Sequence, residues 1–405
     1  MLRIAALSGA SVLAPHKART EEKNRSMRPR LAAVVTEYRV NSHADVIVTK
    51  FLEGCKAVDL DFHPQIEIAS LYLDQTPPND TGVEMARRHS VPVYPTIEGA
   101  LTLGTGKLAV DGVLLIGEHG SYPYNEVGQH LYPRRRFFEE AVAVMRKSGR
   151  VVPTFNDKHL SQSWVDAKWI YDTARELNLP FMAGSSIPLA WRKPELELPV
   201  GTELMEAVAV GYGGTEAYGF HTLEGLQCMA ERRKGGETGV KSVQCLKGDA
   251  VWTAGDQGRW SWELLLAALS RSEKAAVSGA TKEEIRQKAH EPEAFLIEYR
   301  DGFHGTALML YGLAEEFLFA GRIRGTLEPV STHFWLQDGK PFAHFARLCM
   351  AIERMVLTGV PPQPVERTLL TTGILDAVMH SRAQNGERRL TPELALNYSP
   401  TIVPR

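Results

Sequence analysis

An alternation of apolar runs with segments of helical length constrains the fold of this sequence more than any other feature. The apolar runs are short, rich in β-branched residues and typical of buried strands, and they cover residues 31–36, 66–73, 91–94, 111–116, 151–155 and 180–183. Helical segments lie between them, at 41–53, 79–89, 133–147 and 163–177. Because this alternation is typical of parallel sheets with helices on both faces, we predict a doubly wound α/β domain over residues 31–190.

The pattern changes after residue 190, where the apolar runs lengthen and fewer crossovers separate them. These runs cover residues 208–212, 240–246, 295–299 and 306–313. Helical segments surround them at 222–233, 259–271, 281–289, 342–357 and 366–384. We therefore predict a second, α+β domain over residues 191–395, built on an open and mainly antiparallel sheet.

The composition is that of an ordinary globular protein, and it excludes several classes. The 405 residues are 44% hydrophobic and 23% charged, which is enough apolar sequence for a large core. The formal net charge of -2 gives no general attraction to nucleic acid or to anionic membranes. The three arginines at residues 134–136 are interpreted as a solvated helix face. No run approaches the roughly 20 apolar residues that cross a bilayer.

The amino-terminal segment carries a separate expectation. Residues 1–30 are interpreted as a flexible lead or a degraded export signal, because a weakly apolar stretch follows one positive charge and precedes a polar, charged stretch. We expect a cytoplasmic protein, with export as the alternative. The four cysteines are scattered and form no CxxC pair, so they indicate neither a zinc knuckle nor a disulfide scaffold.

Polar residues follow three of the predicted strands at their carboxyl ends. Ordered along the chain, they are Glu37-Tyr38-Arg39, Glu118-His119 and Asp157-Lys158-His159. The first, fourth and fifth strands of a doubly wound sheet lie close together where ligands bind. We therefore expect the three clusters to face one crevice.

Lys158 and His221 are the candidate proton-transfer residues. A lysine suits acid–base work if burial lowers its pKa, although the adjacent Asp157 would oppose that change. As an exposed cation, Lys158 would instead bind a carboxylate or phosphate. His221 ends a glycine-rich segment at residues 211–221, where the backbone can approach a ligand and an imidazole can exchange a proton near neutral pH.

The order of these features resembles the Gfo/Idh/MocA superfamily, sugar-active oxidoreductases with a Rossmann-like dinucleotide-binding domain and a C-terminal sheet domain. The resemblance runs from about residue 31 to 392. The motifs that carry it are Asp-Gly-Val-Leu-Leu-Ile at 111–116, Gly-Arg-Val-Val at 149–152, Asp157-Lys158-His159 at the family's Glu-Lys-Pro, Tyr218-Gly-Phe-His221 at its Asp-x-Gly-x-His, Gly-Val-Pro-Pro at 359–362 and Ile-Leu-Asp-Ala at 374–377.

The resemblance implies that Lys158 and His221 lie beside a substrate hydroxyl, and that one of them takes its proton while hydride passes to NAD or NADP. Asp157 and Glu216 are expected in the same catalytic group, and Asp74 in the place of the acid that holds the adenosine ribose. Further cofactor contacts are expected from Arg39, Asn41, Ser42, Glu118 and His119. The family packs into dimers or tetramers through the open sheet face, so we also expect a homo-oligomer.

Three departures from the family pattern bear on the cofactor and the chemistry. The segment from Thr36 to His43 contains no glycine where the family has Gly-x-Gly-x-x-Gly, so side chains would obstruct a pyrophosphate there. The proline after the lysine is His159. The family's aspartate is Ala217, and the adjacent Glu216 is rotated by about 100° around a helix.

Three functions stay open. The leading one is an NAD(P)-linked oxidoreductase of the Gfo/Idh/MocA type, acting on a sugar, sugar acid or cyclitol. The alternative is a metal-dependent lyase, hydratase or hydrolase acting on a carbohydrate. Its divalent cation would replace the dinucleotide and be bound by Glu37, His43, Glu118, His119 and His159. The third is a catalytically silent sugar-binding protein or scaffold on an enzyme-like fold.

Overall fold

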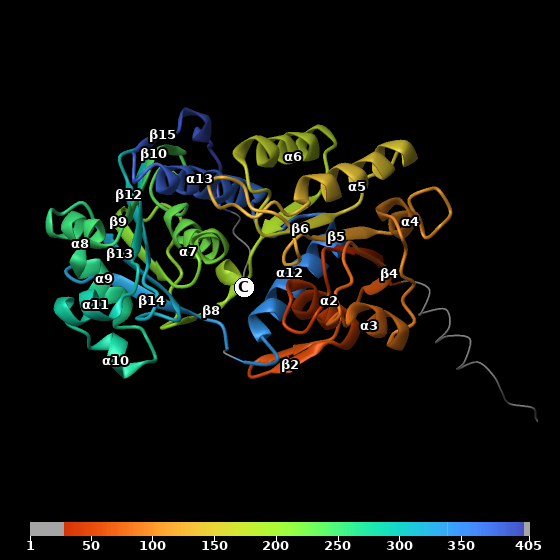
Figure 1. Ribbon diagram of the computed structural model, residues 1–405, viewed down its shortest axis with the longest axis horizontal. Helices are drawn as coiled ribbons and strands as arrows, with labels where there is room; N and C mark the ends of the chain where they lie inside the picture. Colours follow the sequence, from red (N-terminus) through yellow and green to blue (C-terminus); the bar gives the residue numbers. More distant parts are fainter. Residues whose placement is uncertain (1–27, 338, 401–405) are drawn as a thin grey trace, which may run out of the picture.

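The computed structural model describes residues 28–337 and 339–400, which form two packed units (Figure 1). Residues 1–27 of the predicted flexible lead or export signal lie outside the described residues. The cytoplasmic location of the protein stays a prediction. Within the described ranges, no helix combines the length and apolar character that crossing a membrane needs.

The first unit is built on a parallel sheet, which confirms the predicted α/β class. Its strands in the described residues are β1 (Arg30–Val35), β4 (Glu67–Leu73), β5 (Gly112–Ile116), β6 (Thr154–Asp157) and β7 (Phe181–Gly184). The strand order is β4-β1-β5-β6-β7, and every neighbouring pair is parallel. The strand order reverses between β1 and β5, which is where open α/β sheets form a ligand crevice.

Helices cover both faces of this sheet. One face packs on α2 (His43–Glu53), α3 (Gly82–Arg88) and α12 (Ala343–Thr358). The other face packs on α4 (Ile97–Thr102), α5 (Arg134–Ser148) and α6 (Trp164–Glu176). The predicted second domain includes the segment that forms α12, yet this helix packs directly on α2.

The ends of α2 agree with the prediction. The Ser42 hydroxyl caps the helix by accepting from the Asp45 N–H, and Gly54 ends it with φ 75°. Two other segments differ. Residues 91–94 form a single parallel bridge from Val93 to Leu71 instead of a strand. An unpredicted hairpin, β2 (Cys55–Ala57) and β3 (Leu60–Phe62), follows α2, because strands of three residues are too short to show a period.

The second unit contains a mainly antiparallel sheet, as predicted. Its strands in the described residues are β8 (Trp191–Lys193), β9 (Leu204–Gly211), β10 (Val240–Lys247), β11 (Glu293–Tyr299), β12 (His304–Met309), β13 (Phe317–Ile323), β14 (Val330–Trp335) and β15 (Arg389–Leu390). They are ordered β15-β10-β11-β12-β9-β13-β14-β8, and only β12 and β9 run parallel. β8, β13, β14 and β15 were not predicted.

The face of this sheet toward the first unit packs on α7 (Thr215–Ala230) and α13 (Val365–Ala383). The predicted helix at 222–233 begins earlier, at Thr215, because the glycine-rich sequence concealed its first turns. Gly219 lets α7 pack closely on Phe295 of β11. α7 and α13 bring the second unit to the carboxyl ends of β5 and β6.

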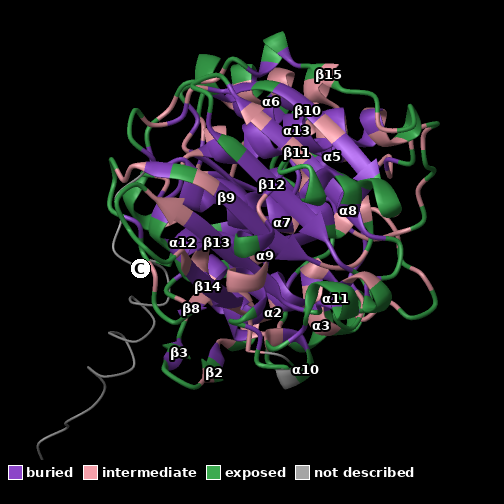
Figure 2. Cartoon of the chain, turned by 90° about the vertical axis from the view of Figure 1, so that its left-hand side faces the viewer, coloured by how far each residue is buried: buried purple, intermediate pink, exposed green. Residues whose placement is uncertain are grey.

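The opposite face of the sheet is partly covered by the chain itself. The covering helices are α8 (Asp249–Asp256), α9 (Trp262–Leu269), α10 (Ala275–Ser278) and α11 (Lys282–Lys288). Seen from this side, the strands are largely buried, and exposed residues gather in the surrounding helices and loops (Figure 2). Self-association through this face stays a prediction, and the chain already covers part of the surface that it would use.

Candidate active site

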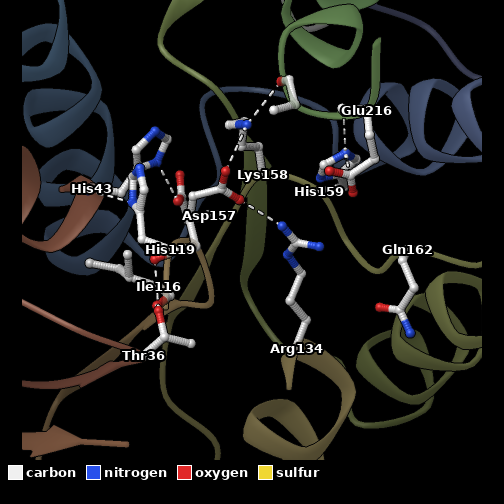
Figure 3. Close-up of polar contacts among 12 residues, drawn as sticks. Thr36, His43, Ile116, His119, Arg134, Asp157, Lys158, His159, Gln162 and Glu216 are labelled. Carbon is white, nitrogen blue, oxygen red and sulfur yellow. Dashed lines mark hydrogen bonds and ion pairs between the residues drawn. The ribbon is translucent and has the colours of Figure 1, made fainter. Parts of the chain in front are cut away.

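The three predicted polar clusters meet at the carboxyl ends of β1, β5 and β6. These strands are neighbours in the sheet, and the loops that follow them contact one another. The Thr36 hydroxyl donates to the carbonyl oxygen of Glu118 (2.7 Å), which joins the first loop to the second. Contacts of Glu118 and Asp157, described next, join the third (Figure 3).

Lys158 links the two units of the protein. It directly follows β6, its side chain is 2% exposed, and its Nζ donates to Glu118 Oε1 (3.1 Å) and to the carbonyl oxygen of Ala217 in α7 (3.0 Å). The lysine is therefore a buried group, and not an exposed cation. An ammonium group has three N–H bonds, so one remains for a ligand.

Glu118 lies between two cations. Its Oε2 accepts from Arg134 Nη2 (2.6 Å), and both side chains are buried. Burial by itself raises the pKa of Glu118, but Lys158 and Arg134 outweigh it and hold that pKa well below its usual value. The interpretation of residues 134–136 as a solvated face is wrong for Arg134, which is 1% exposed because its guanidinium turns inward to this carboxylate.

Asp157 binds His43 instead of Lys158. The distance between Asp157 Oδ2 and His43 Nδ1 is 2.6 Å, and the aspartate side chain is fully buried. The His43 ring contacts the rings of His119 and Phe345 edge-on, with centroids 5.2 and 5.4 Å away. Among the described residues, His43 Nε2 has no hydrogen-bond partner.

His159 and Glu216 face each other across the interface between the units. His159 Nε2 lies 3.2 Å from the carbonyl oxygen of Glu216 and 3.7 Å from its Oε1. Burial, followed by the charges of Arg134 and Lys158, lowers the pKa of His159 well below 6.5, so the imidazole is neutral at pH 7. Burial also raises the pKa of Glu216.

His221 lies on α7 one turn after Ala217, whose carbonyl oxygen holds Lys158. Its half-buried ring lies next to the aromatic side chains of Tyr218, Phe220 and Phe317. Burial, then the nearby Lys158 and His43, lowers the pKa of His221 well below 6.5. A neutral imidazole therefore lies near Lys158, and a catalytic role for this pair stays a prediction.

Several buried polar atoms at this site have no hydrogen-bond partner among the described residues. They are Arg134 Nε and Nη1, Asp157 Oδ1, His159 Nδ1, Glu216 Oε1 and His221 Nδ1. Most buried polar atoms in proteins are paired, so an unpaired group asks for an explanation. We call the region formed by Arg134, His159, Glu216 and His221 the α7 side of the crevice.

The opposite region, the α2 side, consists of residues 37–45 with His119. Here the polar groups other than His43 Nε2 bind mostly one another. Glu37 Oε1 accepts from Arg39 Nε (2.6 Å), and the backbone N–H of Asn41 donates to Asp45 (2.8 Å). His119, which has a left-handed backbone with φ 72°, accepts the N–H of His43 at the start of α2 through its Nδ1 (3.3 Å).

Asp74, the predicted ribose acid, is also engaged. Tyr72 and Tyr122 each donate a hydroxyl to its carboxylate at 2.6 Å, and Arg136 donates at 2.5 Å. Tyr122 comes from the loop 117–133 between β5 and α5. The neighbouring Ser121 exchanges two hydrogen bonds with the Gln75 side chain, so this loop is tied to the end of β4.

The sequence did not identify Arg134 and Tyr122 as site residues, and it suggested His43 only as a metal ligand. Adjacent arginines in a helix look like surface residues, and a tyrosine in a long loop gives no positional signal. In the described part of the chain, no group of three or more His, Cys, Asp or Glu side chains is arranged to hold a metal ion. The structure thus gives the metal-dependent alternative no support.

Comparisons with known proteins find likeness in structure alone. No family model and no curated protein matches the sequence. Solved structures do match, among them GenD2 from gentamicin A biosynthesis in complex with NAD, with a TM-score of 0.55 and 13% identity over 90% of this chain and 96% of that one.

Two further matches come from Lactobacillus casei. The myo-inositol dehydrogenase with NAD(H) and myo-inositol has a TM-score of 0.55 and 12% identity, covering 92% of this chain and 98% of that one. The scyllo-inositol dehydrogenase with NAD(H) and scyllo-inositol has a TM-score of 0.54 and 11% identity, covering 90% and 99%. Over nearly its whole length, this chain therefore has the two-domain fold of GenD2 and of these two inositol dehydrogenases.

Proposed function

We propose that this chain is an oxidoreductase that acts on a sugar, sugar acid or cyclitol bound on the α7 side of the crevice. The fold shared with cyclitol dehydrogenases supports the reaction class. The observation that carries the proposal is the buried Lys158, held between Glu118 and α7 beside the unpaired atoms of the α7 side. A hydroxylated ligand supplies the donors and acceptors that these atoms lack.

In this proposal Lys158 and His221 handle the proton of the reacting hydroxyl. Lys158 donates its remaining N–H to the substrate oxygen, and the neutral His221 accepts the proton. Glu118 and Arg134 keep the ammonium in place, while Asp157 and Glu216 offer their unpaired oxygens to neighbouring hydroxyl groups.

The residues of the α2 side do not fit a nicotinamide dinucleotide placed as the glycine-rich loop places it. His119 accepts the helix N–H that a phosphate would accept, Glu37 pairs with Arg39, and the carboxylate of Asp45 adds negative charge there. Tyr122 and Arg136 take the oxygens of Asp74 that ribose hydroxyls would use. NAD or NADP, with Arg39, Asn41 and Ser42 as contacts, stays a prediction, and we assign no hydride step.

Isothermal titration with NAD and NADP, each with and without myo-inositol or gluconate, tests the oxidoreductase class. We expect heat of binding from one cofactor when the second ligand is present, and loss of the sugar-dependent part in Lys158→Met. Lys168→Met is the matched control, because Lys168 is a half-exposed lysine paired with Asp172. If neither cofactor binds, the protein is not a nicotinamide-linked oxidoreductase.

A redox-neutral reaction on the same substrate class is the second candidate. The specific observation in its favour is that two histidines, His43 and His119, lie at the start of the helix after β1, which is where doubly wound sheets bind the phosphates of a dinucleotide. Epimerisation and elimination of water both need proton-transfer groups and no hydride acceptor.

A further inference from the structure

We infer that His43 and Asp157 form a second acid–base pair, which moves a proton at a carbon next to a carbonyl group of the substrate. The inference rests on the second candidate function, a redox-neutral reaction at Lys158. It assigns a catalytic role to His43 and a positioning role to Asp157.

The geometry of the pair is that of an oriented general base. His43 begins α2 and Asp157 ends β6, so two separate elements fix the 2.6 Å contact between Nδ1 and Oδ2. A carboxylate that accepts from Nδ1–H selects the tautomer in which Nε2 carries a free lone pair. That Nε2 has no partner among the described residues, and the His43 side chain keeps 12% exposure through which a proton can exchange with solvent.

The surroundings hold the imidazole in one orientation. Phe345 from α12 and His119 contact the ring edge-on, which restricts its rotation. Burial, and then the neighbouring His43, lowers the pKa of His119 to about 3, so His119 stays neutral at pH 7. Its Nδ1 is occupied by the backbone N–H of His43, which leaves His43 as the histidine of the α2 side with its acceptor nitrogen open.

His43 and Lys158 face the same space. Asp157 and Lys158 are consecutive residues at the end of β6, where Asp157 contacts His43 and Lys158 contacts Glu118. Figure 3 shows the His43–Asp157 contact next to Lys158 at this end of the sheet.

The step that this arrangement supports is proton abstraction next to a carbonyl. His43 Nε2 takes the proton of the C–H bond, and the electron pair of that bond shifts to the carbonyl oxygen as an enolate. The ammonium of Lys158 stabilises the negative charge. Return of a solvent-exchanged proton gives isotope exchange, and loss of a β-hydroxyl with the proton of His43 gives water. No oxidant or reductant takes part.

Deuterium exchange tests the pair in the full-length protein without added dinucleotide. The probes are 2-keto-myo-inositol, D-fructose and 5-keto-D-gluconate in D₂O, followed by NMR. We expect the wild-type protein to exchange the proton next to the carbonyl of at least one probe. His43→Ala should lower the rate by about 100-fold or more, and added imidazole should restore at least a tenth of it.

Three variants separate catalysis from folding. His43→Gln keeps a donor for Asp157 but cannot transfer a proton, so it should melt near the wild-type temperature and stay inactive. Asp157→Asn should be slower and should not respond to imidazole, which a loosened fold alone would not produce. His63→Ala is the matched control, because His63 also pairs with an aspartate, Asp61, at an exposed position.

The outcomes divide cleanly. Wild-type exchange that is lost in His43→Ala and rescued by imidazole supports the pair. Undiminished exchange in His43→Ala, or no wild-type exchange with any probe, overturns it. A probe that binds the wild-type protein in calorimetry but is not exchanged leaves the carbohydrate site standing and overturns only the pair. Tight binding of NAD with displacement of His119 overturns the pair and supports the oxidoreductase.

Discussion

The two sides of the crevice differ in how their polar groups are satisfied. On the α2 side, Glu37 binds Arg39 and His119 binds the start of α2, so these polar groups are paired without a ligand and His43 Nε2 is left open. On the α7 side, buried nitrogen atoms of Arg134, His159 and His221 and a buried oxygen of Glu216 have no hydrogen-bond partner within the described residues. Each such atom costs about 1–3 kcal/mol when it stays unpaired. The difference indicates that a small molecule binds on the α7 side, whereas on the α2 side protein groups make the hydrogen bonds that a ligand would make.

The largest effect is expected from removing Arg134, the cation that carries two of the unpaired nitrogens. Arg134→Leu should lower the free energy of unfolding by about 3–5 kcal/mol, because it breaks a buried ion pair and leaves Glu118 with one cation. Arg135→Leu, on the same helix, breaks a partly exposed pair with Asp166 and should cost about 0–1 kcal/mol. Urea unfolding at pH 7 measures both, and equal losses would mean that Arg134 is an ordinary surface residue.

A second test compares two buried glutamates. Glu118 is kept ionised by its cations, whereas Glu224, one turn beyond His221 on α7, has its pKa raised to about 7 by burial. Because the folded pKa lies above the unfolded value near 4.5, the stability linked to this group is fully present below pH 4.5 and is lost as pH rises toward 7. The loss is at most about 3 kcal/mol.

Glu224→Gln should remove that pH dependence, since an amide can still accept the Ser185 N–H that Glu224 Oε2 accepts (2.6 Å). Unfolding free energies at pH 5 and pH 8 give the result as a double difference between variant and wild type. Glu203→Gln is the control, because Glu203 is a surface glutamate paired with Lys234. A variant that loses as much stability as the wild type between these pH values would show that Glu224 is already ionised at pH 5.

The smallest effect on stability is expected from a substitution that makes room for a dinucleotide on the α2 side. His119→Gly removes the ring from the start of α2 and places glycine at a backbone with φ 72°, where it fits without strain. The free energy of unfolding should change by no more than about 1 kcal/mol, because relief of the left-handed backbone offsets the lost packing. Titration with NADH should show at least a tenfold gain in affinity. An unchanged affinity would mean that His119 is not what keeps the dinucleotide out.

Local signals in the sequence predicted more than long-range ones did. Ser42 and Gly54 mark the ends of α2 correctly, because capping depends on neighbours within four residues. The meeting of β1, β5 and β6 followed from the rules of doubly wound sheets. The contact between His43 and Asp157 could not be predicted, since it joins residues 114 positions apart and depends on how two loops settle.

Charge pairing and glycine packing were the other limits. Arg134 was assigned to the surface, because only the inward turn of Glu118 reveals its partner. Gly219 weakened the predicted start of α7, although its missing side chain is what lets the helix approach Phe295. In both cases the residue type led to a wrong prediction, because the partner that explains the residue lies in an element distant in sequence.

The late position of α12 in the chain affects the order in which the parts of this protein can fold during synthesis. Residues 343–358 supply Ala346, Ile352 and Met355 to the core beneath α2, so the first-made half emerges from the ribosome with an uncovered apolar face. That half must wait, exposed to misassociation, until almost the entire polypeptide has been synthesised. A truncated chain that ends before residue 343 would keep this apolar surface exposed, and we expect it to aggregate or be degraded.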